Sequence, residues 1–351
     1  MTQAQHEEVL KSLIEIFAER VQRPPLQDGS GADDALASVQ PSSREEVRRV
    51  AEVAARYSVP LIPFGAGTGF EPRTTEGSIL VRFDLMRGLR SPHRQEPWVE
   101  AEPGVSWLQL EDHLRPSGRG LVVYPTSAPR ATVGGWLARD GLGVGSFEYG
   151  WLRENVVSAN VVLVGGERRE ISGEELSTFF VPGSATGIVV GARIKTRGVE
   201  ADVPFAAVFT EAEDLADAVA GIVGSQMPLW HLAFLNPAMS RARALGDDYL
   251  LFGAYPRERQ TKVAAPLREV VQTSRSRLLG AADAYRVWGE RFFPVAPSHP
   301  TPVPTDRVLI DVGDVSKVLD RFSPKAVQGT VARSREALLL AFDASRDDQP
   351  R

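Results

Sequence analysis

Apolar residues recur at helical spacing at the start of the chain and again after Ser43. In residues 1–20 acidic positions interrupt the apolar ones, which predicts an amphipathic helix. Ser43 and Glu46 form a capping-box pattern, so a second helix is expected to begin there and to end near Tyr57. The apolar run 59–64 that follows contains two prolines, which suits an edge strand better than a central one.

The remainder of the first half predicts one more helix and several strands. Ser106 and Gln109 repeat the capping pattern and predict a helix through Leu114. The expected strands are 79–83, 98–101, 121–124 and 188–196, together with a hairpin of 156–164 and 168–171 around the Gly165–Gly166 turn.

After Gly198 glycine becomes rarer, and short apolar strands alternate with helical stretches. The expected strands are 205–209, 229–235, 249–255, 308–312 and a last one ending near 342; the expected helices are 211–223, 258–273, 281–291 and 315–322. An antiparallel sheet with helices on one face is the simplest packing for this order. We therefore expect a lead-in at 1–29, a first domain at 30–199 and a second domain at 200–351.

Composition limits the chemistry of the chain. With 351 residues and 43% hydrophobic content, two domains can each bury a core. The net charge of -5, without clustered Lys and Arg, argues against nucleic acid as a partner. Zero cysteines exclude thiolate zinc sites and iron–sulfur clusters held by this chain, and the histidines show no metal-ligand spacing, so no metal is expected. No membrane span or signal peptide is recognisable, which predicts a cytoplasmic protein.

Three regions rich in small residues carry the main chemical signal. Gly65–Gly69 follows a predicted strand, and its small residues would let backbone N–H groups approach a phosphate. A Rossmann turn is rejected, because the third glycine comes one residue early and no helix follows. Taken alone, the loop could equally be a turn without a ligand. The further glycine-rich regions 132–150 and 183–189 favour backbone shaped around a long ligand.

Five motifs occur in order between residues 40 and 197: P-S-S-x-E-E-V, V-P-L-I-P-F-G-A-G-T-G, V-E-A-E-P-G-V, Y-P-T-S with T-V-G-G and Y-G, and G-S-A-T-G-I-V-V. On these motifs the chain resembles the FAD-binding fold of the vanillyl-alcohol oxidase and p-cresol methylhydroxylase superfamily, and within it the glycolate oxidase flavoprotein subunit and the D-lactate dehydrogenases. The resemblance implies an α+β protein, with a two-subdomain FAD-binding domain followed by a smaller α+β cap domain that contains an antiparallel sheet.

The resemblance also implies a set of cofactor contacts. Residues expected at the pyrophosphate are Gly65, Ala66, Gly67, Thr68 and Gly69; those at the ribityl chain and flavin are Pro125, Thr126, Ser127, Thr132, Val133, Gly134 and Gly135; those at the adenosine half are Gly183, Gly187, Ile188 and Val189. Pro63, Phe70, Gly141 and Tyr149 complete the set. Many relatives attach flavin to a histidine or a cysteine. Here Thr68 stands where such a histidine often lies, and the chain has no cysteine, so FAD is expected to bind non-covalently.

The second domain offers fewer candidates. Arg291, in the stretch 288–294, resembles an arginine that anchors the substrate carboxylate, although a surface or salt-bridged helix end would also explain it. His231 is a candidate base for the substrate hydroxyl, and its alternative is a satisfied core histidine. Tyr149 is a third catalytic candidate, from the flavin domain.

These features together predict an FAD-dependent dehydrogenase that oxidises a small 2-hydroxy acid, such as glycolate or D-lactate, by hydride transfer to flavin. The short second domain and the absent cysteines suggest the flavoprotein subunit of a larger complex, with an iron–sulfur or other electron-accepting partner. The alternatives are an FAD-binding relay or structural subunit without substrate chemistry, an oxygen-using oxidase of an alcohol, sugar or aromatic compound, and a binding module without flavin.

Overall fold

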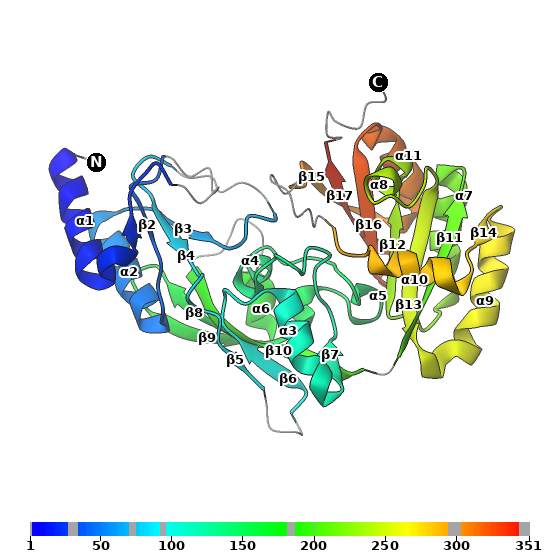
Figure 1. The fold of residues 1–351 in the computed structure, drawn as a ribbon, viewed down its shortest axis with the longest axis horizontal. Coiled ribbons are helices and arrows are strands. Elements are labelled where there is room, and N and C mark those ends of the chain that lie inside the picture. The colour runs from blue at the N-terminus through cyan, green and yellow to red at the C-terminus, as the bar shows by residue number, and fades with distance from the viewer. Residues whose placement is uncertain are drawn as a thin grey trace. The chain divides into compact units, whose positions relative to one another are not determined.

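The computed structural model describes residues 2–26, 34–69, 75–91, 96–180, 187–199, 201–293 and 303–343. Contacts divide the chain into two compact units (Figure 1). The first unit comprises Met1–Leu121, Ala128–Asp140 and Asn155–Arg197; the second comprises Val122–Ser127, Gly141–Glu154 and Gly198–Arg351. Two short segments from the middle of the sequence, 122–127 and 141–154, therefore fold with the C-terminal part of the chain. The functional division at residue 200 stays a prediction.

The first unit begins with a small sheet and two helices. Its elements are α1 (Gln3–Phe17), α2 (Arg44–Tyr57), β1 (Val21–Gln22), β2 (Ala37–Val39), β3 (Leu61–Phe64) and β4 (Ile79–Arg82). In the described residues the strand order is β1-β2-β4-β3, with β2 and β3 both parallel to β4. The edge position predicted for the proline-containing strand β3 is confirmed, since a proline has no N–H to donate to a further strand.

The N-cap of helix α2 explains why its bounds could be predicted from the sequence. Its end at Tyr57 is confirmed, and the Ser43 side chain accepts a hydrogen bond from the Glu46 N–H. The Glu46 carboxylate does not complete the capping box. It accepts hydrogen bonds from Arg20, at 2.7 Å to each oxygen, and from the Ser42 N–H. The Arg20 hydrogen bonds lower the pKa of Glu46 to about 2.

A larger sheet completes the first unit. Its strands are β5 (Leu89–Arg90), β6 (Trp98–Ala101), β7 (Arg119–Leu121), β8 (Val156–Leu163), β9 (Arg168–Ser172) and β10 (Gly187–Gly198), and three helices accompany it: α3 (Trp107–Leu114), α4 (Val133–Leu137) and α6 (Glu174–Phe179). Helix α3 begins with the complete predicted capping box of Ser106 and Gln109. The hairpin of β8 and β9 is also confirmed, and both turn glycines, Gly165 and Gly166, have φ +91°.

One strand of the first half was predicted too far along the chain. A strand was expected at 121–124, but β7 ends at Leu121. Tyr124 forms only an isolated bridge with Val144, because residues 122–127 leave the first unit and join the second. The apolar run is therefore shared between two units instead of forming one strand.

The second unit is built on an antiparallel sheet, in the described residues of seven strands in the order β14-β11-β13-β12-β16-β17-β15. Its strands are β11 (Asp202–Phe209), β12 (His231–Leu235), β13 (Tyr249–Pro256), β14 (Arg277–Leu278), β15 (Asp306–Asp311), β16 (Ala326–Val331) and β17 (Glu336–Phe342). Its helices are α5 (Ser146–Tyr149), α7 (Ala212–Ser225), α8 (Pro237–Ala242), α9 (Gln260–Thr273), α10 (Ala281–Gly289) and α11 (Val315–Phe322). The antiparallel sheet predicted for this half of the chain is confirmed.

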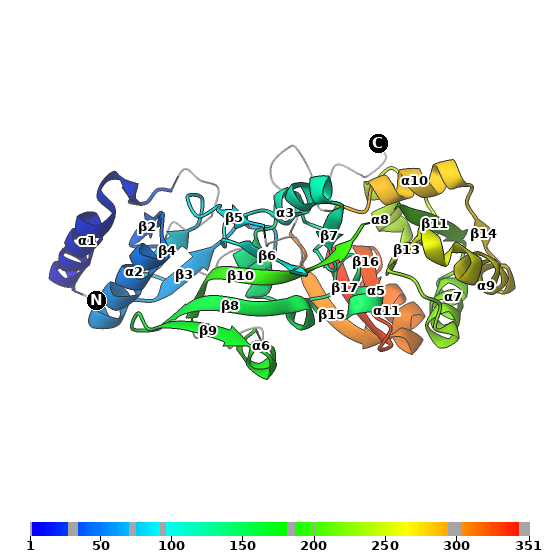
Figure 2. The ribbon, with the colours of Figure 1, turned by 90° about the horizontal axis from the view of Figure 1, so that it is seen from below.

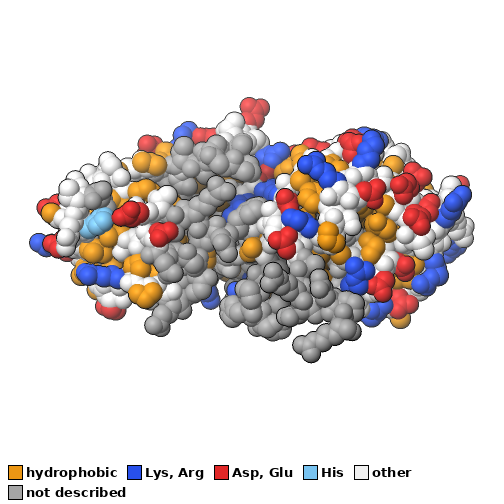
Figure 3. Space-filling model, turned by 90° about the horizontal axis from the view of Figure 1, so that it is seen from above, with side chains coloured by type: hydrophobic (Ala, Val, Ile, Leu, Met, Phe, Trp, Pro, Cys, Tyr) orange, Lys and Arg blue, Asp and Glu red, His pale blue; other side chains and the backbone are white. Residues whose placement is uncertain are grey.

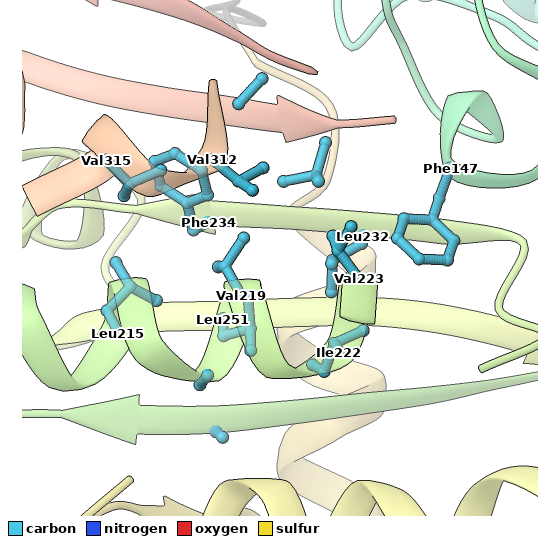
Figure 4. Close-up of a cluster of buried hydrophobic side chains, with 14 of the residues drawn as sticks. Phe147, Leu215, Val219, Ile222, Val223, Leu232, Phe234, Leu251, Val312 and Val315 are labelled. Carbon is cyan, nitrogen blue, oxygen red and sulfur yellow. The ribbon is translucent and has the colours of Figure 1, made fainter. Parts of the chain in front are cut away.

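Helices cover both faces of this sheet, so the prediction of helices on one face is wrong (Figure 2). Leu232 and Phe234 of β12 belong to the core cluster with α7, α9 and α11, whereas Ala233 and Leu235 belong to a second cluster with α8 and α10. Successive side chains of a strand point to opposite faces, and here both sets are apolar, so each face needs its own cover. Figure 4 shows the α7 residues Leu215, Val219 and Ile222 packed against the first of these faces.

The surface agrees with the composition. On the face shown in Figure 3, acidic and basic side chains are interspersed over the second unit. Within the described parts of the chain, no helix combines the length and apolarity that crossing a membrane would require.

Candidate functional site

The glycine loop Gly65–Gly69 leaves β3 and lies against a second predicted motif. A Cβ added at Gly65 would fall 2.5 Å from Thr132 Oγ1, and one added at Gly135 would fall 3.0 Å from the same atom. Gly67 has φ +66°, a conformation that residues with a Cβ rarely adopt. A side chain at Gly65 would force the loop or Thr132 to move, and this close approach brings two motifs about 70 residues apart into one cradle.

The third motif, V-E-A-E-P-G-V, fixes the Thr132–Gly135 motif by backbone hydrogen bonds. Thr132 is the N-cap of α4, and its Oγ1 accepts from the Gly135 N–H at 3.3 Å. The Val133 N–H donates to the Val105 carbonyl at 2.8 Å, and the Gly134 N–H donates to the Pro103 carbonyl at 2.9 Å. The turn after β6 thus fixes the start of α4 against the glycine loop.

Arg139 places positive charge beside the same loop. A Cβ added at Gly69 would lie 2.8 Å from Arg139 Nε and 3.0 Å from its Cζ. A loop of small residues with a guanidinium at its end suits a pyrophosphate, which takes backbone N–H groups and charge-assisted hydrogen bonds. The sequence reasoning missed Arg139. Its only signal was its position four residues after Gly135, in the same glycine-rich stretch.

The predicted adenosine contacts are described only in part. Gly187 begins β10 opposite Leu163, and a Cβ there would lie 2.8 Å from the Val162 carbonyl oxygen. Ile188 and Val189 are buried, and Ile188 belongs to the apolar core around α2. Two further predicted contacts, Gly183 and Phe70, lie outside the described residues.

Among the predicted catalytic residues, His231 is the most buried. It is 0% exposed, and its Nδ1 accepts a long hydrogen bond, 3.4 Å, from the Gly145 N–H. Its Nε2 has no hydrogen-bond partner among the described residues. Burial lowers the pKa of His231 to about 3, and the charge of Arg291 adds to this effect. His231 is therefore neutral at pH 7.

The hydrogen bond from Gly145 also defines the proton position on the ring. A backbone N–H can only donate, so Nδ1 must be the unprotonated nitrogen. The proton of the neutral ring then lies on Nε2, where it forms a buried donor that the described protein atoms do not use. A buried donor without a protein partner is costly, and an ordered water or a bound ligand can accept its hydrogen bond.

Arg291 follows α10 by two residues, and the His231 ring centroid lies 5.7 Å from that of Trp288, which Arg291 also contacts. Its guanidinium packs over the rings of Trp288, at 4.6 Å, and Phe292, at 4.2 Å. Nη1 donates to the Trp288 carbonyl at 2.8 Å, and Nε lies 3.4 Å from the Tyr124 hydroxyl. No carboxylate of the described residues forms an ion pair with Arg291. Arg291 is partly exposed, and a guanidinium without a carboxylate partner can bind an anion.

The segment 122–127 is fixed by side chains of the second unit. Trp230 Nε1 donates to the Val122 carbonyl at 3.1 Å. Gln328 Nε2 donates to Thr126 Oγ1 at 3.1 Å, and the Phe293 N–H donates to the Thr126 carbonyl at 3.0 Å. Thr126 itself is partly exposed. The neighbouring predicted flavin contacts, a buried Pro125 and a partly exposed Ser127, lie on the same segment.

The segment 141–154, which carries Gly141 and Tyr149, is anchored in the second unit as well. Phe147 is 0% exposed and packs beside Leu232 in the core (Figure 4). Arg259 forms a two-pronged ion pair with Glu148, at 2.9 Å to each oxygen. Tyr149, the next residue, ends α5 and is partly exposed. Among the described residues, no group of three or more His, Asp or Glu side chains has the arrangement of a metal site.

Residues 35–172 match the family model described as the FAD binding domain. This match shows an FAD-binding domain, with FAD as its cofactor, and confirms the predicted resemblance. The fold is that of the p-cresol methylhydroxylase type, as the predicted fold class has it. The solved structure of p-cresol methylhydroxylase with substrate bound superposes with a TM-score of 0.75 at 14% identity, covering 99% of this chain and 84% of that chain.

Curated relatives support the same grouping. The chain is 30% identical over 217 residues to the probable D-lactate dehydrogenase, mitochondrial, of Danio rerio, covering 58% of this chain and 43% of the relative. It is 25% identical over 212 residues to glycolate oxidase subunit GlcD of Bacillus subtilis, covering 57% of this chain and 45% of the relative. The chain thus spans less than half the length of these relatives.

Proposed function

We propose that this protein is an oxidoreductase that oxidises a CH–OH group of a small 2-hydroxy acid, with glycolate and D-lactate as the first substrates to test. The observation that carries this proposal is that Arg291, which has no carboxylate partner among the described residues, and His231, whose Nε2 has no described partner, both pack against Trp288, at 4.6 Å and 5.7 Å from its ring centroid. A cation and a neutral donor suit a carboxylate next to a hydroxyl oxygen. The similarity to a D-lactate dehydrogenase and a glycolate oxidase subunit supports the same substrate class.

In the first unit, the glycine cradle and Arg139 would bind the pyrophosphate of FAD, which when bound supplies the two-electron acceptor for such an oxidation. In the second unit, the segment 125–127 is proposed as a flavin contact on the resemblance alone. The loop provides backbone N–H groups where a Cβ would clash, and Arg139 adds a positive charge. These features fit a pyrophosphate. Binding would be non-covalent, since Thr68 offers no ring nitrogen for attachment and the chain has no cysteine.

The protein side of the reaction would be binding and orientation of the substrate. Arg291 would bind the carboxylate in two-pronged fashion, held in place by Trp288 and Phe292. His231 would donate from Nε2 to the hydroxyl oxygen. The base role predicted from sequence would need the other tautomer, in which Nδ1–H would face the Gly145 N–H, so the geometry favours a donor over a base.

We also propose that the chain works with an electron-accepting partner. The relative of Bacillus subtilis is named as a subunit, and the absence of cysteine means that an iron–sulfur cluster on the electron path would need another chain. Isolation of the protein from its native host at low detergent, followed by iron analysis of the co-purifying chains, tests this. Recovery of a yellow protein alone, active with a soluble dye and free of iron, would contradict it.

An anaerobic titration of the purified, FAD-loaded protein tests the proposed oxidation. Glycolate or D-lactate should bleach the oxidised flavin absorbance, and lactamide, which lacks the carboxylate charge, should not. Bleaching by dithionite but by none of several 2-hydroxy acids would overturn the proposal. Peroxide release under air would favour an oxidase. Acid precipitation should release the yellow colour into the supernatant, as expected for non-covalent flavin.

A further inference from the structure

A closed ring of four interactions in the second unit links Arg243 to Thr126. Arg243 is the C-cap of α8, is 7% exposed, and donates from Nη2 to Gln328 Oε1 on β16. Gln328 Nε2 donates in turn to Thr126 Oγ1 at 3.1 Å. The Phe293 N–H donates to the Thr126 carbonyl at 3.0 Å, and the Phe293 ring lies 4.8 Å from the Arg243 guanidinium carbon. The ring thus grips Thr126 from its side chain and from its backbone.

Arg243 is an unusual residue to find at this depth. Its other described hydrogen bond runs from Nη1 to the Glu290 carbonyl, at 2.9 Å, and its Nε has no partner in the described part of the chain. Burial lowers the pKa of Arg243 to about 9, so it remains a cation at pH 7. No carboxylate of the described residues forms an ion pair with Arg243, and the charge of Glu290 only opposes the lowering of its pKa by burial. A buried cation without an ion pair is costly for folding, so stability alone is a poor reason for its presence.

The charge of Arg243 gives the chain of hydrogen bonds a direction. A guanidinium has only donors, so the Gln328 amide must turn its oxygen toward Arg243 and its NH2 group toward Thr126. Thr126 Oγ1 therefore accepts, and its own hydrogen remains to be donated. The described residues offer that hydrogen no acceptor, and Thr126 is partly exposed. A threonine in this state presents a donor to whatever binds beside it.

We propose that Arg243 is a positioning residue, which acts through Gln328 to fix the Thr126 hydroxyl as a hydrogen-bond donor to bound flavin. The inference rests on the proposed placement of the segment 125–127 against the flavin. The charge at the start of the chain polarises each following hydrogen bond and so strengthens the last one.

Gln328→Glu is the decisive variant. The new carboxylate keeps the contact with Arg243 and turns it into an ion pair, so the fold is retained. It has no NH2 group, and the Thr126 hydrogen would now be donated back to it and lost to the flavin. We expect the FAD dissociation constant to rise roughly fivefold, the equivalent of one hydrogen bond, without a lower melting temperature of the FAD-free protein.

A double-mutant cycle separates positioning from a structural effect. If Gln328 acts through Thr126, then Gln328→Glu should weaken FAD binding in the wild-type background and change it little in a Thr126→Val background, whereas Thr126→Ser should keep near wild-type affinity. Arg241→Gln is the matched control, because Arg241 lies on the same helix in an exposed ion pair with Asp247, at 3.2 Å.

The measurement is FAD affinity by fluorescence titration, which needs no substrate. Additive effects of Gln328→Glu and Thr126→Val, or an unchanged dissociation constant in Gln328→Glu, would overturn the proposed role of Arg243. Failure of every 2-hydroxy acid to bleach the wild-type flavin would instead overturn the proposed oxidation, and a non-additive cycle would still establish that Gln328 acts on FAD binding through Thr126.

Discussion

The candidate binding groups of the two units are of different kinds. In the first unit the cradle is backbone: glycines 65, 69 and 135 lie where a Cβ would collide with Thr132 or Arg139. In the second unit the candidate polar groups are side chains, chiefly His231 and Arg291, and both pack against the Trp288 ring. Under the proposed function, a cofactor of constant shape would be bound by main chain, and a small substrate by side chains.

This difference also decides how each half responds to mutation. A glycine cradle has no side chain to truncate, so it is damaged by adding atoms. The side-chain cluster is damaged by removing them, because each lost group leaves a neighbour without a partner. Variants of the glycine cradle and variants of the side-chain cluster should therefore have different effects.

The largest effect is expected from Arg291→Met, which keeps the length and the packing against Trp288 but removes the charge. Loss of a charge-assisted, two-pronged contact with a carboxylate is worth about 4 kcal/mol, or roughly a thousandfold in kcat/KM for a 2-hydroxy acid. Steady-state assays with a dye acceptor measure this effect.

The control for Arg291→Met is Arg286→Met. Arg286 lies on the same helix, is exposed, and has Asp283 3.8 Å away. It should retain wild-type kinetics, and FAD binding should be normal in both variants. A kcat/KM in Arg291→Met within threefold of wild type would remove Arg291 from the substrate site.

An intermediate effect is expected from Gly65→Val in the other unit. The added side chain would enter the space of Thr132 Oγ1, and relief of that overlap must move the loop or α4. Such overpacking costs about 3 kcal/mol, which corresponds to roughly a hundredfold weaker binding of FAD. Fluorescence titration of the FAD-free protein measures the dissociation constant.

Gly198→Ala is the matched control for that variant, since a Cβ at Gly198 meets nothing within 4 Å. The melting temperature of the FAD-free protein should be close to wild type in both variants, because the loop is partly exposed. Tight FAD binding by Gly65→Val would show that the loop is an ordinary turn.

The contrast between backbone and side chains also explains what could be predicted from the sequence. Helix α2 and the hairpin at Gly165 and Gly166 depend on caps and turns that are complete within a few residues, so their bounds were readable. The glycine loop could be predicted for the same reason, because it is a local motif. It is also one of five motifs that occur in the order of the family that the chain resembles. That FAD contacts each of the predicted residues stays a prediction.

Long-range relations were not readable. The two-sided cover of the second sheet escaped prediction because adjacent apolar positions on β12 face different helices, which a linear pattern does not separate. Arg243, Gln328 and Thr126 come from three distant segments, and no spacing connects them. Arg243 stands among other arginines in the sequence, and only its burial sets it apart from Arg241.

The smallest expected effect is the loss of stability at low pH, in which the two units should also differ. In the second unit the folded-state pKa of His231, about 3, lies below its unfolded value of 6.5. The neutral form is thus favoured by folding, and its contribution is full above pH 6.5 and declines as the pH falls toward 3. In the first unit, Glu46 has a folded pKa of about 2 against 4.5, so its contribution declines only below pH 4.5.

Between pH 7.5 and 5.0 the protonation of His231 in the unfolded state should therefore lower the unfolding free energy of the wild-type protein by about 2 kcal/mol. In a His231→Gln variant this contribution is absent, so its unfolding free energy should fall by about 2 kcal/mol less than that of the wild type. Urea unfolding at the two pH values, followed by tryptophan fluorescence, measures the difference, since three of the six tryptophans, Trp151, Trp230 and Trp288, lie in the second unit. Hydrogen exchange should locate the change in β12 and leave α2 protected at pH 5.0. Equal pH dependence in wild type and variant would mean that His231 is hydrated and able to take up a proton, which would restore the case for a general base.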